Sequence, residues 1–426
     1  MPQQNLLFVT VDCLRADFVG TDHADTPFLD SLAAEGVDYR ELYATATTTT
    51  PCVASLFTGA YSEHNGVYSL EEARLDSDVS TLAEHLSAAG YDTAALVTGP
   101  LVADTDLDRG FDTYAYRDRR AELLGEWFDD AVAAVEGLDE PFFAYLHLWE
   151  IHDPVAVPEA YDDPEYGQYP YARTLSALDR ALEDLHDHLP ANTVTALHGD
   201  HGEAIAYRDS YLHKLCKFLR TGFRYGLGID TRAIERRLKR RYGRDLAIPD
   251  HFMEDGHGEN VFDFVANVPF VLSGPGIDSA TVDAQVRQVD IAPTILDLLG
   301  VDPEDPSTGD ASAGDTAPGG PFPDGESLLP PEDVQARTAY MRACGKSLLR
   351  EENWQRAVRA DGRKYVEYPD RDWDPECYDL DADPLELDPS PDDPKTTRLR
   401  GRMPEESVRD GERLEIGGLL EDLGYK

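Results

Sequence analysis

A run of hydroxyl and thiol side chains between Thr47 and Gly59, TTTTPCVASLFTG, could supply a nucleophile. It holds five threonines, one serine and one cysteine, with a proline in the middle and Thr-Gly at its end. A hydroxyl is a weak nucleophile at its ordinary pKa and needs activation by a cation or a base. The structural alternative is that the threonines only cap a helix that begins near Cys52 or Val53.

Acidic and imidazole side chains lie next to several apolar runs that are typical of buried strands. Asp12 follows LLFVTV, His152 follows PFFAYLHL, and Asp200 and His201 follow TVTALHG. His257 lies ahead of the run VPFVLSG. Function in an open α/β sheet gathers at the carboxyl ends of the strands. Oxygen and imidazole ligands brought together there from distant segments are typical of a divalent-metal site.

Each of these residues also has a structural explanation when it is taken alone. An Asp after a strand often ends a turn or caps a helix. A single histidine such as His64, His147 or His198 is more often packed in the core or exposed to solvent than bound to a metal. The coincidence of several such residues at one predicted edge nevertheless favours a metal-dependent hydrolase.

Apolar runs and helical periodicity alternate along the chain and indicate the elements that position these residues. Strands are expected at 6–11, 92–98, 141–148, 193–199 and 268–274, and helices at 26–36, 81–90, 121–136, 172–188 and 290–300. This alternation predicts an α/β fold whose large, mostly parallel sheet is sandwiched between helices.

Two segments interrupt the alternation. Residues 208–245 hold twelve Lys or Arg against four Asp or Glu and contain two helical stretches, which define a basic helical insertion at about 204–256. Residues 302–326 are rich in Pro, Gly and Asp and are expected to form a linker. The predicted organisation is a catalytic domain at 1–301, that linker, a small antiparallel α+β subdomain at 327–390 and a polar tail at 391–426.

The chain of 426 residues is strongly acidic, with 83 Asp or Glu against 38 Lys or Arg and a formal net charge of −45. We interpret this surface as halophilic, because high salt screens its self-repulsion. The same charge argues against nucleic acid as a partner. Five cysteines without paired spacing argue against a disulfide framework. Neither a signal peptide nor a long apolar run is evident, so we expect a cytoplasmic protein without a transmembrane segment.

Seven motifs in order resemble the sulfatase family of the alkaline-phosphatase-like superfamily, in a variant with a threonine nucleophile. The likeness extends from about residue 5 to 390. The motifs are VTVDCLRADFVG, the segment from Thr50-Pro51 to Thr58-Gly59, FFAYLHLWEIHDP, GDHGE, GHGENVFDFVANVPFVLSGPG, VDIAPTILDLLG and CYDLDADPLE. The resemblance implies a large α/β domain, a C-terminal antiparallel subdomain and one divalent cation. It also implies hydrolysis or transfer of a sulfate or phosphate ester through a covalent intermediate.

The resemblance implies a role for each matching residue. The metal ligands would be Asp12, Asp200 and His201, together with the nucleophile. Many members carry a second Asp next to the first, where this chain has Cys13. Water or a substrate oxygen would then complete the coordination. His152 would hold the oxygens of the transferred group, and His257 would bind oxygen or protonate the leaving group.

The nucleophile is assigned by counting back from Thr58. In true sulfatases a Cys converted to formylglycine, in the pattern Cys-x-Pro-x-Arg, precedes the Thr by nine residues. Counting back nine residues from Thr58 reaches Thr49 and places Pro51 at the position of the family's proline. Thr48 or Thr50 would act if the register shifted by one.

Cys52 is the alternative nucleophile, because Cys-x-Ala is a spacing that some modifying enzymes accept. Leu56 then stands where the Arg should be, and Thr58 is three residues too close. Thr49 is chemically reasonable, since a bound cation lowers the pKa of a hydroxyl and a helix N-terminus favours an anion. A threonine lacks the aldehyde route by which formylglycine expels sulfate, which favours phosphate esters and a phosphodiesterase or phosphotransferase.

The basic insertion begins and ends beside the predicted metal site and is expected to overhang it. Its cations would bind an anionic substrate, such as a small-molecule ester or a lipid head group, or would dock on the acidic body or on another subunit of a homo-oligomer. His213 and Lys214 are alternatives to His257 for binding substrate. Arg15 would carry charge near the site or pair with Asp17.

The function predicted from these observations is a metal-dependent, sulfatase-like hydrolase or transferase of a phosphate or sulfate ester. Thr49 is its nucleophile, and its metal is Mn, Mg, Ca or Zn. Two alternatives stay open. One is a formylglycine-type sulfatase that uses Cys52, and the other is an inert binding protein, which the change to Cys13 would favour.

Overall fold

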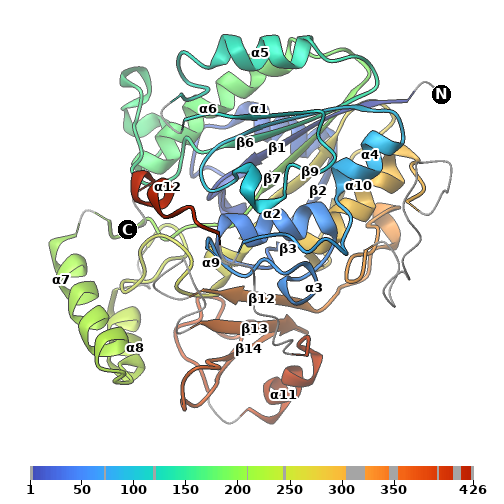
Figure 1. The fold of residues 1–426 in the computed structure, drawn as a ribbon. Helices are drawn as coiled ribbons and strands as arrows, with labels where there is room; N and C mark the ends of the chain where they lie inside the picture. The colour runs from blue at the N-terminus through green and yellow to red at the C-terminus, as the bar shows by residue number, and fades with distance from the viewer. Residues whose placement is uncertain are drawn as a thin grey trace.

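The computed structural model describes residues 3–71, 73–118, 121–208, 210–242, 246–303, 322–344, 354–390, 393–405 and 414–423. Its central feature is an eight-stranded sheet in the order β10-β2-β9-β7-β1-β6-β4-β5 (Figure 1). Its strands are β1 (Asn5–Val11), β2 (Val37–Tyr39), β4 (Asp92–Val97), β5 (Thr113–Tyr116), β6 (Phe142–Leu148), β7 (Thr193–Gly199), β9 (Phe270–Ser273) and β10 (Ala280–Val282).

The middle of the sheet is parallel, which confirms the predicted fold class. β1 lies between β6 and β7 and pairs with both in parallel register. β9 departs from this direction, because it pairs antiparallel with both β7 and β2. The mostly parallel arrangement brings the carboxyl ends of β1, β6 and β7 to one edge of the sheet.

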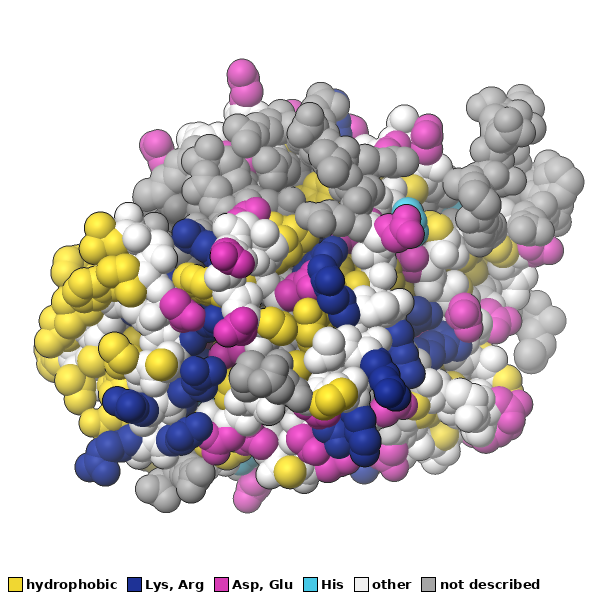
Figure 2. All heavy atoms as spheres, turned by 90° about the horizontal axis from the view of Figure 1, so that it is seen from below, with side chains coloured by type: hydrophobic (Ala, Val, Ile, Leu, Met, Phe, Trp, Pro, Cys, Tyr) yellow, Lys and Arg dark blue, Asp and Glu magenta, His cyan; other side chains and the backbone are white. Residues whose placement is uncertain are grey.

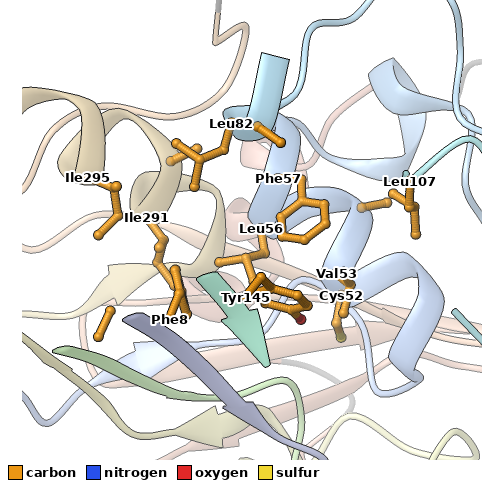
Figure 3. Packing of buried hydrophobic residues seen from close by; sticks show 14 of the residues in the cluster. Phe8, Cys52, Val53, Leu56, Phe57, Leu82, Leu107, Tyr145, Ile291 and Ile295 are labelled. Carbon is orange, nitrogen blue, oxygen red and sulfur yellow. The ribbon is translucent and has the colours of Figure 1, made fainter. Parts of the chain in front are cut away.

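Two hydrophobic layers cover the sheet, and alternate residues of β1 point into each. Leu6 and Phe8 pack with α2 (Thr49–Thr58), α4 (Leu82–Ala88) and α10 (Ile291–Leu299), the layer shown close up in Figure 3. Leu7 and Val9 pack with α1 (Pro27–Glu35), α5 (Phe128–Glu136) and α6 (Pro170–His186) on the other face (Figure 1). The unbroken apolar runs of the sequence therefore correspond to strands buried on both sides.

Local signals set the ends of the helices. Thr81 caps α4 by accepting a hydrogen bond from the Glu84 N–H, and the Glu84 carboxylate accepts one from the Thr81 N–H. α2 ends at Gly59, whose φ of +58° is in the left-handed region. α2 begins at Thr49. If the threonines only capped the helix, it would begin near Cys52, three residues later. The third threonine of the run is therefore already helical.

A smaller antiparallel sheet lies beside the main one (Figure 1). Its strands are β12 (Ala339–Ala343), β13 (Gln355–Ala360), β14 (Arg363–Glu367) and β15 (Glu376–Asp379). A three-stranded sheet joins β3 (Leu42–Tyr43), β8 (Asn267–Val268) and β11 (Val286–Arg287). The short helices are α3 (Ser62–Asn65), α9 (Asp263–Ala266), α11 (Pro394–Thr397) and α12 (Gly417–Asp422). Most of the expected linker, residues 304–321, lies outside the described residues.

The basic segment forms a helical hairpin at the side of the molecule (Figure 1). It consists of α7 (Tyr211–Arg220), a π-helical turn η5 (Thr221–Gly226) and α8 (Arg232–Tyr242). Within the described parts of the chain, none of the helices combines the length and the apolar character needed to cross a bilayer.

Candidate active site

The candidate site lies at the carboxyl ends of the three adjacent strands β1, β6 and β7. Asp12 follows β1, His152 follows β6, and Asp200 and His201 follow β7. The N-terminus of α2 brings Thr49 to the same place. Asp12, Asp200 and His201 are fully buried.

Thr49 is the threonine of its run that contacts these residues. Its Oγ1 donates a hydrogen bond of 3.1 Å to Asp12 Oδ2 and lies 3.4 Å from His201 Nε2. The helix N-terminus behind it is a favourable place for an anion, because its first N–H groups have no partner within the helix. The start of α2 can therefore hold the Thr49 hydroxyl, as a nucleophile, next to a bound anion.

The side chains on either side of Thr49 have other contacts. Thr48 Oγ1 lies 3.7 Å from the sulfur of Cys344. The Cys52 thiol donates to the Ala46 carbonyl over 3.1 Å and lies in the hydrophobic layer between α2 and the sheet (Figure 3). Burial also raises the pKa of the Cys52 thiol well above its ordinary value. The hydrogen bond of the Cys52 thiol is therefore to a backbone carbonyl, whereas that of Thr49 is to a site carboxylate.

Two buried carboxylates face each other across the site. Asp200 Oδ1 accepts hydrogen bonds from the backbone N–H groups of Cys13 and His201 at 3.0 and 2.7 Å. Its Oδ2 has no hydrogen-bond partner among the described residues and lies 3.4 Å from His201 Nε2. Burial raises the pKa of Asp200 to about 7. Burial, and then the charge of Asp200, raises the pKa of Asp12 well above its usual range.

These residues fit a divalent cation. The carboxylates of Asp12 and Asp200 and the rings of His201 and His147 supply oxygen and nitrogen donors. The donor atoms of Asp12, His147 and Asp200 lie within 4.8 Å of one another, and so do those of Asp12, His201 and Cys13. Burial lowers the pKa of His201, so its ring is neutral, which is the form that binds metals. A cation would give Asp200 Oδ2 a partner, and its charge would offset the repulsion between the carboxylates of Asp12 and Asp200.

Cys13 is part of the same cluster. Its backbone is left-handed, with φ of +66°. Its thiol donates to Asp12 Oδ1 over 2.9 Å and lies 3.6 Å from His257 Nδ1. Burial, and then the charge of Asp12, raises the thiol pKa well above its ordinary value, so the sulfur is protonated here. The thiol therefore contacts the carboxylate as a neutral donor.

His152 and His257 stand above the carboxylates, nearer to solvent. Their rings are 5.2 Å apart, and the His257 ring is 4.3 Å from that of His201. His257 Nε2 has no hydrogen-bond partner among the described residues. Burial lowers the pKa of His152 to about 3, and the charge of His257 contributes to the same shift. The two rings can therefore contact oxygens of a bound group.

Three further residues belong to the site although the sequence did not single them out for it. Glu203 Oε1 lies 3.5 Å from His257 Nδ1 and 2.6 Å from the Arg208 guanidinium. Burial acts to raise the Glu203 pKa, but Arg208 and His257 outweigh it and hold that pKa below its usual range. His147 Nε2 lies 3.6 Å from Asp12 Oδ2.

Of these three residues, Glu203 had a signal in the sequence, whereas His147 is identified by the register of the structure. Glu203 lies two residues after His201 in GDHGE. His147 is the penultimate residue of β6 and pairs with Thr10 at the end of β1, two residues before Asp12.

Three residues considered for substrate binding lie elsewhere. Arg15 is fully buried and contacts Asp17 through two hydrogen bonds, and it also donates to the carbonyls of Glu203 and Pro249. His213 is buried, and its ring contacts the Phe252 carbonyl. Lys214 is exposed on α7. The Arg15 guanidinium thus links the segments that contain Asp17, Glu203 and Pro249.

Comparisons with known proteins agree with this architecture. A family model described as Sulfatase matches residues 4–301. The uncharacterized sulfatase YidJ of Escherichia coli is 24% identical over 355 residues, which are 71% of this chain and 69% of YidJ. The multifunctional alkaline phosphatase superfamily protein PehA of Trinickia caryophylli is 32% identical over 205 residues, or 43% of this chain and 38% of PehA. The phosphonate monoester hydrolase of Agrobacterium radiobacter has the same fold, with a TM-score of 0.64, 18% identity and 94% of each chain covered.

Proposed function

The chain belongs to the sulfatase family of the alkaline-phosphatase-like superfamily, and we propose that it is a metal-dependent hydrolase or transferase with a threonine nucleophile. Its substrate would be an anionic phosphate or sulfate ester of a small molecule or a lipid head group. The observation that carries the proposal is the position of Thr49 Oγ1, 3.1 Å from Asp12 at the start of α2. Asp12, Asp200 and His201 are the residues that would hold a divalent cation, whose charge lowers the pKa of a hydroxyl and offsets charge on the transferred group.

In the first step, Thr49 Oγ forms a bond to phosphorus or sulfur, and the bond from that atom to the leaving oxygen breaks. Asp12 accepts the hydrogen bond of the Thr49 hydroxyl and is placed to take its proton. His257 supplies a proton to the leaving oxygen, since its Nε2 has no hydrogen-bond partner among the described residues while its Nδ1 lies 3.5 Å from the Glu203 carboxylate. His152 binds an oxygen of the transferred group.

In the second step, water or an acceptor alcohol attacks the same phosphorus or sulfur, and the bond to Thr49 Oγ breaks. Thr49 recovers its proton from the group that accepted it, and the attacking oxygen loses its proton to the His257 ring. Between the two esters we propose phosphate, since a threonine has no aldehyde form through which to expel sulfate.

The proposal is tested by trapping the covalent intermediate. The protein is mixed with an aryl sulfate, a phosphate monoester and a phosphate diester in turn, quenched, and analysed by peptide mass spectrometry of residues 41–72. We expect an adduct from the phosphate probes on Thr49, and Thr49→Ala should lose the adduct together with activity by at least roughly 10³-fold. Thr48→Ala is the matched control, because its hydroxyl faces Cys344 and not Asp12.

Two outcomes would contradict the assignment. Persistence of the adduct in Thr49→Ala would assign the chemistry to another side chain. Conversion of the Cys52 thiol to an aldehyde, seen in the intact mass, would indicate a formylglycine enzyme instead. Metal analysis of the purified protein at high salt distinguishes an enzyme, whether it uses Thr49 or Cys52, from an inert binding protein. No divalent cation should be found in an inert binding protein.

A further inference from the structure

Exposed apolar side chains gather on the α7–η5–α8 hairpin. Ten large hydrophobic side chains are exposed among the described residues, and nine of them lie between residues 211 and 234. The tenth is Tyr116 on β5. The nine, which we call the hairpin face, are Tyr211, Leu212, Leu215, Phe218, Leu219, Phe223, Leu227, Ile229 and Ile234. Such a concentration of exposed apolar surface marks a place where something binds.

α7 is oriented opposite to an ordinary surface helix, which buries its apolar side. Its buried side carries His213 and Arg220, and the partly buried Lys217 lies beside them. Lys217 Nζ donates to the Asp255 carbonyl over 3.0 Å, and Arg220 pairs with Glu254 at 3.2 Å. These polar contacts attach the helix to the protein by its basic side. The apolar side is thereby left facing solvent.

Exposed cations surround the hairpin face. Lys214 is exposed between the apolar residues of α7, and Arg237, Arg240 and Arg241 are exposed on α8. Seen from below, hydrophobic side chains gather at one side of the molecule, with Lys and Arg beside them (Figure 2). Aromatic and aliphatic side chains flanked by Lys and Arg are typical of a helix that lies on an anionic lipid surface.

We propose that the hairpin face docks on an anionic lipid bilayer, with the apolar side chains inserted at the boundary of head groups and acyl chains and the cations at the lipid phosphates. α7 has ten residues and is therefore about 15 Å long, half of a hydrocarbon core of about 30 Å, so it lies on the bilayer and does not span it. A second copy is a poorer occupant. A symmetric contact through this face would bring Lys214 and Arg237 of both copies together without partners.

The basic side of α7, opposite the hairpin face, is connected to the candidate active site through ion pairs. Asp255 lies 3.5 Å from Lys217 of α7 and 3.7 Å from Arg208, and Arg208 pairs with Glu203. A docked hairpin would therefore hold the site close to lipid head groups. This favours a lipid-borne ester as substrate, and that consequence alone rests on the proposed function.

Vesicle co-sedimentation of the full chain tests the docking without any turnover. The probes are vesicles of phosphatidylcholine alone and of phosphatidylcholine mixed with phosphatidylglycerol, at about 1 M salt, where a Debye length of about 3 Å removes long-range repulsion from the acidic body. The disrupting variant is Leu215→Ser with Phe218→Ser, two residues that are 56% and 74% exposed. Tyr116→Ser is the matched control, since it removes an exposed apolar side chain outside the hairpin.

We expect the wild-type protein to sediment with the mixed vesicles and more weakly with phosphatidylcholine alone. Each serine substitution on the hairpin should weaken partitioning by roughly tenfold, whereas Tyr116→Ser should leave it unchanged. Lys214→Gln with Arg237→Gln should remove the preference for the anionic vesicles. Two results would overturn the proposal. One is no sedimentation with either vesicle, and the other is self-association in light scattering that the double serine variant abolishes while vesicle binding stays absent.

Discussion

Cys13→Asp tests the electrostatics of the candidate metal site most directly. Cys13 lies where many members of the family carry a second Asp, and its thiol already contacts Asp12 Oδ1 at 2.9 Å. The backbone there is left-handed, with φ of +66°, a conformation that Asp and Asn adopt more readily than other side chains. The substitution therefore adds a third carboxylate with little change in local geometry.

The magnitude follows from the separation of the charges. Two unit charges about 3 Å apart repel by roughly 5 kcal/mol at an effective dielectric constant of about 20. The new carboxyl can escape this repulsion by taking up a proton, which costs about 4 kcal/mol at pH 7 for a group with an ordinary pKa near 3.9. The free energy of unfolding should therefore fall by at most about 4 kcal/mol without a cation. With a divalent cation bound, the third carboxylate becomes a ligand and the loss should disappear or reverse.

The assay is urea unfolding at constant high salt, once with a chelator and once with each of Mg²⁺, Mn²⁺, Ca²⁺ and Zn²⁺ in excess. Cys13→Asn is the matched control, because it has the shape and backbone preference of Asp without its charge. We expect Cys13→Asp to be less stable than Cys13→Asn in chelator and at least as stable with one of the cations. An equal gap in all conditions, or none in chelator, would refute the view that these carboxylates surround a cation site.

Three other predictions concern stability. Arg208→Met should lower the free energy of unfolding at pH 7 by about 3–5 kcal/mol, because it removes the guanidinium beside the buried Glu203 carboxylate and leaves that carboxylate only its contact with His257. The Glu203 pKa is held below its unfolded value, so its contribution is present above about pH 4 and is lost as the pH falls, and the gap between the two proteins should close on acidification. Phe57→Ala removes a ring whose centroid is 4.8 Å from that of Tyr145 in the layer of Figure 3. It should lower the free energy of unfolding in urea by about 3–5 kcal/mol, and a loss below about 1 kcal/mol would contradict the packing. Thr81→Ala removes the cap of α4 and should cost about 1 kcal/mol, which Thr81→Ser should restore.

The fold was predictable because its signals are local. Runs such as Leu6–Val11 are apolar throughout, which is typical of strands covered on both faces, and helices alternate with them. The direction of β9 was not predictable, because the short connection through β8 carries no local mark of an antiparallel strand. Pairing partners depend on contacts between distant segments, which periodicity does not record.

The candidate site was predictable only in part, for the same reason. Asp12 and Asp200 follow adjacent parallel strands, so their meeting follows from topology. His147 belongs within a strand, and only the register of β6 against β1 shows that its ring faces Asp12. The pairing of Arg15 with Asp17 is local, but its burial depends on the carbonyls of Glu203 and Pro249, which are far away in sequence.

The hairpin shows where a pattern argument gives the wrong face. The sequence of α7 is clearly amphipathic, and the usual rule would turn its apolar residues inward. The segment 254–259 is acidic and lies against α7, so Arg220 turns inward to Glu254 and Glu259. An arginine held by two carboxylates is not easily released, because turning the helix over would remove the arginine from Glu259 and leave Glu254 with Lys239 alone. The apolar residues of α7 are therefore kept at the surface by the charges on its opposite side, and the proposed docking would cover them.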